Sequence, residues 1–209
     1  MIRRTKEEAQ QTRDALLDAA EVVFERRGVA ATSLQAIAEA AGVTRGAVYW
    51  HFRGKADLYI AMMDRAVLPF EQHWLVADPA DEDRPLRRLR ELLFDILRQV
   101  AGDARLRRVV AISMLKVEYV GELDAIRLRH LQVATQAVKR FEALLRLAAA
   151  AGQLAPGVSA SVAARAVHSL VDGLIINWAL DTRAFDLRRT GRLAVRQLLA
   201  GLSRPGAAD

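Results

Sequence analysis

The sequence has 209 residues, of which 52% are hydrophobic and 27% are charged, and it contains no cysteine. This composition is typical of a globular protein with a substantial core, and it excludes disulfides, thiolate zinc sites and cysteine nucleophiles. The net charge is +6, but residues 1–60 hold nine Lys/Arg and eight Asp/Glu, so the positive excess lies mostly further on. Overall basicity therefore does not identify a nucleic-acid-binding region by itself.

The chain shows no pattern of a signal peptide or a membrane span. The N-terminal residues MIRRTKEEAQQTR are charged, whereas a signal peptide has an apolar central segment. The most apolar run, from Leu170 to Leu180, is interrupted by Asp172 and Asn177, and it is shorter than the roughly 20 residues that a span requires. We expect a cytoplasmic protein without membrane contact, and we expect no metal ion and no cofactor.

The N-terminal quarter has the pattern of short helices. Apolar residues recur at helical spacing over residues 16–24, and Gly28 predicts the end of this first helix. Thr32 or Ser33 is expected to cap a second helix, and Gly42 is expected to form the turn that follows it.

Thr44 is a good N-cap for a third helix, over about Arg45–His51. Two short helices joined by a glycine turn predict a helix–turn–helix, with which many proteins place side chains in the major groove of DNA. The alternative is a plain helical hairpin without that function.

The rest of the sequence predicts six further helices and no strand, which gives an all-α fold of nine helices. One helix starts near Lys55, and Pro69 should kink or end it. The clearest loop is Asp78–Pro85, and Gly121 and Gly152 mark two further breaks. The other helical stretches cover residues 86–96, 106–114, about 122–151, 159–180 and 186–202.

The third helix has an unusual outward side. With Val48 as the inward reference and 100° per residue, the outward sector holds Arg45, Gly46, Tyr49 and Trp50. Arginine can bind guanine edges with two hydrogen bonds, aromatic rings can pack on sugars or thymine methyl groups, and a glycine allows close approach. An exposed pair of large aromatic residues without a partner is costly for solubility. This sector is therefore our candidate for reading bases.

Further side chains around this helix are candidates for contacts with phosphates. The hydroxyl or imidazole groups can donate hydrogen bonds, and the lysine lies where the next helix begins, so its charge adds to the free N–H groups and the positive dipole there. These candidates are Thr32 or Ser33, Thr44, Tyr49, His51 and Lys55.

His168 and Asp172 are four residues apart and share one helix face. Neither a third catalytic group nor a nucleophile in a recognisable motif accompanies them, so we do not expect an enzyme. Two interpretations remain: a structural pair, or a polar anchor at Asp172 in an otherwise apolar pocket.

The segment GVTRGAVYWHF at residues 42–52, followed by Lys55 and Leu58, resembles the signature of the TetR family. It is especially similar to the AcrR/TtgR branch, which controls multidrug efflux pumps. The segments RRTKEEA at 3–9, TR at 12–13, KVEY at 116–119 and VDGL at 171–174 also resemble that branch. The resemblance covers nearly the whole chain and is most specific over residues 3–58. It implies a homodimeric, all-helical repressor of nine helices, with base contacts from the third helix and phosphate contacts from Thr44, Tyr49, His51 and Lys55.

The resemblance also predicts what the large apolar part does. The helices over 159–180 and 186–202 would form a four-helix interface between two subunits, although the first of them could instead be fully internal. Similar proteins line a ligand pocket from the corresponding helices. The expected walls here are Leu89, Leu92, Leu93, Ile96, Val110, Met114, Phe141, His168, Val171, Asp172 and Ile176. The stretch Ile112–Leu115 and Ile176 are apolar where relatives often carry polar groups, which favours a bulky, mostly apolar ligand.

We therefore divide the chain into a helix–turn–helix DNA-binding domain, residues 1–54, and a ligand-binding and dimerisation domain, residues 55–209, with the helix from Lys55 as the connector. The predicted function is repression: a homodimer binds double-stranded operator DNA, controls a multidrug efflux pump and is released by an apolar small molecule. The alternatives are a TetR-type regulator of other genes, and an activator or architectural DNA-binding protein without ligand release. The sequence names neither the effector, nor the operator, nor the regulated genes.

Overall fold

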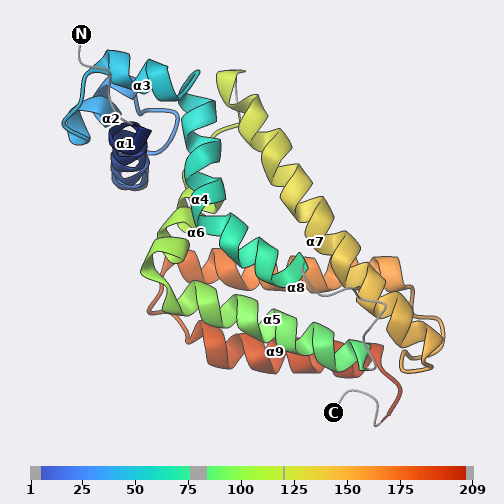
Figure 1. Cartoon of the computed structure of the whole chain (residues 1–209). Helices are drawn as coiled ribbons and strands as arrows, with labels where there is room; N and C mark the ends of the chain where they lie inside the picture. The colour runs from blue at the N-terminus through green and yellow to red at the C-terminus, as the bar shows by residue number, and fades with distance from the viewer. Residues whose placement is uncertain (1–5, 76–83, 120, 206–209) are drawn as a thin grey trace. The chain divides into compact units, whose positions relative to one another are not determined.

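The computed structural model describes residues 6–75, 84–119 and 121–205. Nine α-helices and one 3-10 helix form the regular structure of these residues, which confirms the predicted all-α fold (Figure 1). The only β structure in the described part is an isolated bridge between Leu154 and Ser203. The helices are α1 (Lys6–Arg27), α2 (Leu34–Ala40), α3 (Arg45–His51), α4 (Lys55–Leu75), α5 (Pro85–Gly102), α6 (Ala104–Leu115), η2 (Gly121–Leu123), α7 (Asp124–Ala150), α8 (Ala160–Leu180) and α9 (Leu187–Leu202).

The chain forms two compact units. Unit 1 comprises residues 1–69 and 108–130, and unit 2 comprises residues 70–107 and 131–209. Three helices, α4, α6 and α7, therefore contribute residues to both units. The division at residues 54 and 55 is a division by function, and it stays a prediction because packing alone does not test it.

Glycines and capping side chains set the ends of the first three helices. Gly28 after α1 and Gly42 after α2 have φ angles of +78° and +67°, which L side chains rarely adopt. The side-chain oxygens of Ser33 and Thr44 accept the backbone N–H three residues later, at 3.2 and 3.3 Å. Of the two residues predicted for the α2 cap, Ser33 is the one that forms it.

Two prolines lie at helix positions that differ from those predicted by the sequence pattern. Helix α4 continues past Pro69 to Leu75, so this proline does not end the helix. Residues 78–83 of the predicted loop lie outside the described part of the chain. Pro85, its last residue, instead begins α5, where the missing N–H has no helical partner to lose.

The core of unit 1 joins the first three helices to parts of α4, α6 and α7. Val48 of α3 and the following Phe52 are buried in it, so the opposite side of α3 faces outward. Burial of each such side chain contributes about 1.5–3 kcal/mol relative to its exposure. The other members are Leu16, Leu17, Ala19, Ala20, Val23, Phe24, Val29, Ile37, Ala38, Leu58, Tyr59, Met62, Val109, Ile112, Leu123 and Ile126.

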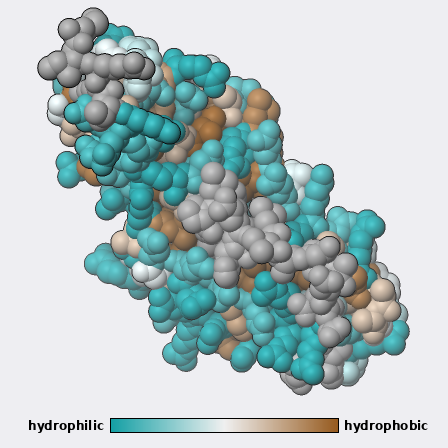
Figure 2. Space-filling view, in the orientation of Figure 1, coloured by the Kyte–Doolittle hydropathy of each residue, from teal (hydrophilic) through white to brown (hydrophobic). Residues whose placement is uncertain are grey.

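In unit 2, α5, α8 and α9 pack side by side (Figure 1). Helix α8 buries one side but leaves Val162 and Leu180 exposed, each by 67%, so it is not fully internal in this chain. Leu193 of α9 is also exposed. Figure 2 shows that the drawn face is mainly hydrophilic, with hydrophobic residues in small separate areas. None of the described helices is long and apolar enough to cross a membrane.

Candidate DNA-binding surface and effector site

The outward side of α3 carries the four residues that the helical period placed there. Arg45 and Gly46 are exposed, and the side chains of Tyr49 and Trp50 are 50% and 72% exposed. Val48 is fully buried on the opposite side. The predicted orientation of the helix is therefore confirmed.

Arg45 and Tyr49 form one connected group on this surface. An Nη of Arg45 donates a hydrogen bond to the Tyr49 hydroxyl at 3.1 Å, and the guanidinium carbon lies 5.4 Å from the centre of the ring. Such a cation–π contact contributes about 0.5–1 kcal/mol at an exposed site. Because the contact restricts both side chains before binding, less conformational entropy is lost when they meet a partner.

The rings that follow support each other. The His51 and Trp50 ring centres are 4.5 Å apart at an interplanar angle of 86°, an edge-to-face geometry that aromatic pairs favour. His51 also lies beside Phe52, whose ring is covered by the Arg13 guanidinium at 5.2 Å. The exposed Trp50 ring therefore packs on His51, which in turn lies against the buried ring of Phe52.

Gly46 has room around it. A Cβ atom built on this residue would meet only the Thr44 side-chain oxygen, at 3.8 Å, which is an ordinary contact. The fold of the chain therefore does not require glycine at this position. If glycine is needed at position 46, the need comes from a molecule that binds to this surface.

Lys55 and Thr32 hold the loop before α2. The Lys55 ammonium donates hydrogen bonds to the carbonyl oxygens of Ala30 and Thr32, at 3.0 and 3.1 Å. The Thr32 hydroxyl donates to the Gly28 carbonyl at 2.7 Å, and its residue is only 2% exposed. The structure thus gives Thr32 an internal bond, whereas Ser33 is exposed.

The first turn of α4 already contains a carboxylate. The backbone N–H of Arg53 donates to Asp57 at 3.0 Å, and this bond, helped by the Arg53 guanidinium, holds the pKa of the Asp57 carboxyl below its usual value. The Arg53 side chain itself is 92% exposed. Positive charge next to α4 therefore comes from Lys55 and Arg53 together.

The expected effector-binding residues are divided between the units. Val110 and Met114 belong to unit 1 and are half-buried, and the other nine belong to unit 2. Six of those nine are buried, and Ile176 is half-buried. The buried six are Leu89, Leu92, Leu93, Ile96, Phe141 and Val171.

His168 and Asp172 form a pair, with Nδ1 and Oδ2 3.3 Å apart. The His168 ring lies 6.4 Å from the ring of Phe141, a buried residue of the predicted wall. In the described part of the chain, no cluster of three or more His, Asp or Glu residues could hold a metal ion.

Two family models match most of the chain. One, described as bacterial regulatory proteins of the tetR family, matches residues 16–62. The other, the C-terminal region of MAATS-type transcriptional repressors, matches residues 84–203. The chain belongs to the TetR family. Regulators of this family bind operator DNA and small-molecule effectors, and they are typically dimers.

Named relatives of this TetR-family chain agree with that assignment. The HTH-type transcriptional regulator TtgR of Pseudomonas putida is 41% identical over 187 residues, which are 90% of this chain and 89% of the relative. The solved structure of NalD, the secondary repressor of the MexAB-OprM multidrug efflux pump in Pseudomonas aeruginosa, is 36% identical, with a TM-score of 0.86 over 94% of this chain and 99% of that one. A SmeT–triclosan complex is 35% identical, with a TM-score of 0.83 over 95% and 94%. The resemblance to the efflux-repressor branch is thus confirmed, and the chain is a transcriptional regulator rather than an enzyme.

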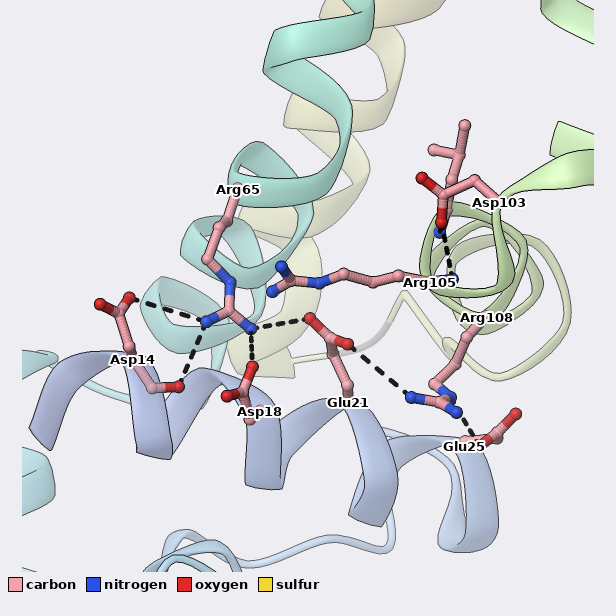
Figure 3. A network of polar contacts seen from close by, with 9 residues as sticks. Asp14, Asp18, Glu21, Glu25, Arg65, Asp103, Arg105 and Arg108 are labelled. Carbon is pink, nitrogen blue, oxygen red and sulfur yellow. Dashed lines mark hydrogen bonds and ion pairs between the residues drawn. The ribbon is translucent and has the colours of Figure 1, made fainter. Parts of the chain in front are cut away.

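Sequence reasoning missed one group in this TetR-family regulator. The side chain of Glu21 in α1 is 4% exposed and lies in an ion-pair network (Figure 3). A signal was present, because Glu21 is four residues after Leu17 and three before Phe24, which places it on the inward face of an amphipathic helix. A carboxylate at such a position is buried only with charged or hydrogen-bonding partners.

Proposed function

We propose that the chain is a homodimeric repressor that binds double-stranded operator DNA through α3 and releases it when a bulky, mostly apolar small molecule binds. The observation that carries the proposal is the exposed sector of α3, which holds Arg45, Gly46, Tyr49 and Trp50. Core packing requires none of these four residues, and a side chain would fit at Gly46. The regulated operon encodes a multidrug efflux pump, in line with what the names of NalD and SmeT say of those proteins. As a protein that acts on chromosomal DNA, it works in the cytoplasm.

In the proposed complex, Arg45 binds a guanine edge, and Tyr49 and Trp50 pack on sugars or thymine methyl groups. Residues 1–54 form the DNA-binding domain. Two copies of α3 read half-sites about one helical turn apart, roughly 34–36 Å. Phosphate contacts come from the rim of this surface: Ser33, Thr44, Tyr49, His51 and Lys55, with Thr32 acting through its position beside Lys55.

Residues 55–209 bind the effector and the second subunit. Exposed apolar side chains on α8 and α9, such as Val162, Leu180 and Leu193, favour a four-helix interface between subunits. The buried apolar residues of unit 2 and the His168–Asp172 pair favour an apolar ligand with one polar anchor. The complex of SmeT with triclosan supports a small-molecule ligand for a relative of this chain.

Release requires a ligand that prefers the conformation unable to bind DNA. To shift the equilibrium a hundredfold, it needs about 2.7 kcal/mol of differential affinity between the two conformations. Helix α4 connects the two functional domains, so a ligand that displaces α4 changes the spacing of the two α3 helices.

Substitutions on the two sides of the α3–α4 turn test the DNA-binding proposal. Arg45→Ala should weaken operator binding by about 1–3 kcal/mol and relax the preference at one base pair, whereas Lys55→Ala should weaken binding to all sequences about equally. Fluorescence anisotropy with the operator and its single-base variants measures both effects. Arg87→Ala is the control, because this arginine of α5 is also exposed and carries the same charge.

The operator itself is found by footprinting the DNA upstream of the protein's own gene, where we expect protection of a palindrome. If Arg45→Ala kept both the affinity and the base preference of the unchanged protein, the assignment of α3 as the reading helix would be wrong.

A further inference from the structure

Helix α1 carries a row of carboxylates that faces two arginines from other helices (Figure 3). Spacings of four, three and four residues place the row on one side of the helix. We call it the acidic row; its members are Asp14, Asp18, Glu21 and Glu25. The two arginines are Arg65 of α4 and Arg108 of α6, and all six residues belong to unit 1.

Arg65 binds three members of the row. One Nη lies 2.6 Å from Asp18 and 2.8 Å from Glu21, and the other donates to the Asp14 carbonyl oxygen at 3.2 Å. The Arg65 side chain is only 19% exposed. These bonds fix the position of α4 along α1.

Glu21 joins this arginine to the second one. Its Oε1 pairs with Arg65, and its Oε2 lies 4.0 Å from an Nη of Arg108, whose Nε is 3.0 Å from Glu25. One buried carboxylate therefore lies between α4 and α6. Removing either arginine would leave this charge with fewer partners in a position shielded from water, which is unfavourable.

The positions of these pairs along the chain are informative. Helices α4, α6 and α7 are the three that contribute to both units, and they pass from one to the other at residues 69/70, 107/108 and 130/131. Arg65 and Arg108 lie at or near two of these points. At the third, Arg129 of α7 binds Asp64 of α4 through Nε and Nη2, at 3.0 and 2.7 Å. Every helix that leaves unit 1 is thus held by a charged pair close to where it leaves.

We propose that Glu21 is a positioning residue for operator binding: its carboxylate holds α4 and α6 against α1 in the arrangement that presents α3 to DNA, and the effector acts by separating one arginine from it. This inference rests on the proposed function, whose regulation it specifies. The Glu21 side chain is only 4% exposed, so we assign it no direct contact with DNA. A buried carboxylate that has lost one of these two arginines is unfavourable. Arrangements of α4 and α6 between the DNA-binding and the released form are therefore sparsely populated, and the protein responds to the effector as a two-state switch.

The test is Glu21→Gln, which keeps the size of the side chain and removes its charge. We expect operator affinity, measured by anisotropy without effector, to fall by about tenfold or more. Simple electrostatics predicts the opposite sign, because removing a negative charge from the DNA-binding unit should strengthen contact with phosphates. Glu25→Gln is the matched control: it lies on the same helix and pairs with Arg108, but its side chain is 49% exposed. It should change the affinity by no more than about twofold.

A double-variant comparison tests whether Glu21 acts through its arginines. Arg65→Gln alone should weaken operator binding. The loss in the double variant should be clearly smaller than the product of the two single losses, because both substitutions remove the same Glu21–Arg65 pair. Effects that multiply would show that the two residues act independently and would overturn the proposal. So would a folded Glu21→Gln protein that binds operator as well as the unchanged protein or better.

Hydrogen exchange of the full-length protein distinguishes a local loosening of α1 and α4 from unfolding of the whole chain. It also tests this inference independently of operator binding. Amides of α1 and of α4 up to residue 69 should exchange faster in Glu21→Gln, and those of α5, α8 and α9 should not change. If the unchanged protein bound no operator, the proposed function would fail, and unchanged exchange in α1 and α4 would then still overturn this inference. If Glu21→Gln did not fold, Arg108→Gln serves in its place, and the same loss of affinity and the same local exchange are expected.

Discussion

Single residues on the outward side of α3 have properties that packing of the core does not require. Trp50 is largely exposed, and Gly46 has space for a side chain. The helical period was sufficient to predict this sector, because the buried Val48 fixes the rotation of a two-turn helix. If these residues serve DNA binding, they should lower the stability of the free protein and raise its affinity for the operator. Experiment can separate these two effects.

Gly46→Ala separates them most clearly. Alanine in a helix is more favourable than glycine by about 0.5–1 kcal/mol, and nothing in the fold opposes the added methyl group, so unfolding by urea should show a more stable protein. Operator affinity should fall, because the methyl group occupies the space where the helix approaches the groove.

Gly201→Ala is the control for this substitution. Gly201 is an exposed helical glycine of α9 with nothing near its position, so alanine there should stabilise the protein similarly and leave operator binding intact. Unchanged operator binding by Gly46→Ala would contradict the close approach of α3 to the groove.

Other residue roles could not be read from the sequence. Lys55 binds the carbonyl oxygens of Ala30 and Thr32, and backbone oxygens of distant residues leave no trace in the pattern of side chains. The cap of α2 was ambiguous because both Thr32 and Ser33 have suitable hydroxyls. The burial of Glu21 was predictable in principle, since the residue interrupts an apolar face, but its arginine partners are 44 and 87 positions away.

At the scale of elements, apolar spacing located all nine helices of the described chain, but it did not predict what prolines do inside them. Pro69 lies within α4, and Pro85 begins α5. A proline can lie inside a helix or begin one, and apolar spacing alone does not distinguish the two cases. The spacing also gave no sign of how closely two helices approach each other.

Helices α5 and α9 approach each other closely at Gly191. A Cβ atom there would lie 2.5 Å from a terminal methyl of Leu97, and both residues are buried. Gly191→Leu should therefore force the helices apart and destabilise the protein by about 1–3 kcal/mol, which a thermal or urea melt would show. Arg189→Leu is the control, because it adds the same side chain to an exposed position of the same helix. Equal stability of the two variants would contradict close α5–α9 packing.

At the scale of the whole molecule, the sequence predicted a DNA-binding part and a larger helical part, but not which segments pack together. Residues 108–130 join the first unit through long-range contacts, such as the hydrogen bond from the Val29 N–H to the Lys116 carbonyl at 2.9 Å. Contacts of this kind depend on the folded chain and have no local signal. In the proposed function they would matter because α4, α6 and α7 belong to both units. A change in unit 2 on effector binding would then have three covalent routes to the first three helices.

The most direct test of ligand-released repression is a titration of the complex between the full-length protein and its fluorescent operator with a panel of apolar compounds that includes triclosan, followed by anisotropy. We predict that at least one compound that binds the free protein in calorimetry lowers the anisotropy, in a saturable manner, to the value of free DNA. If compounds that bind the protein left the operator bound at saturating concentrations, the account of release would be contradicted.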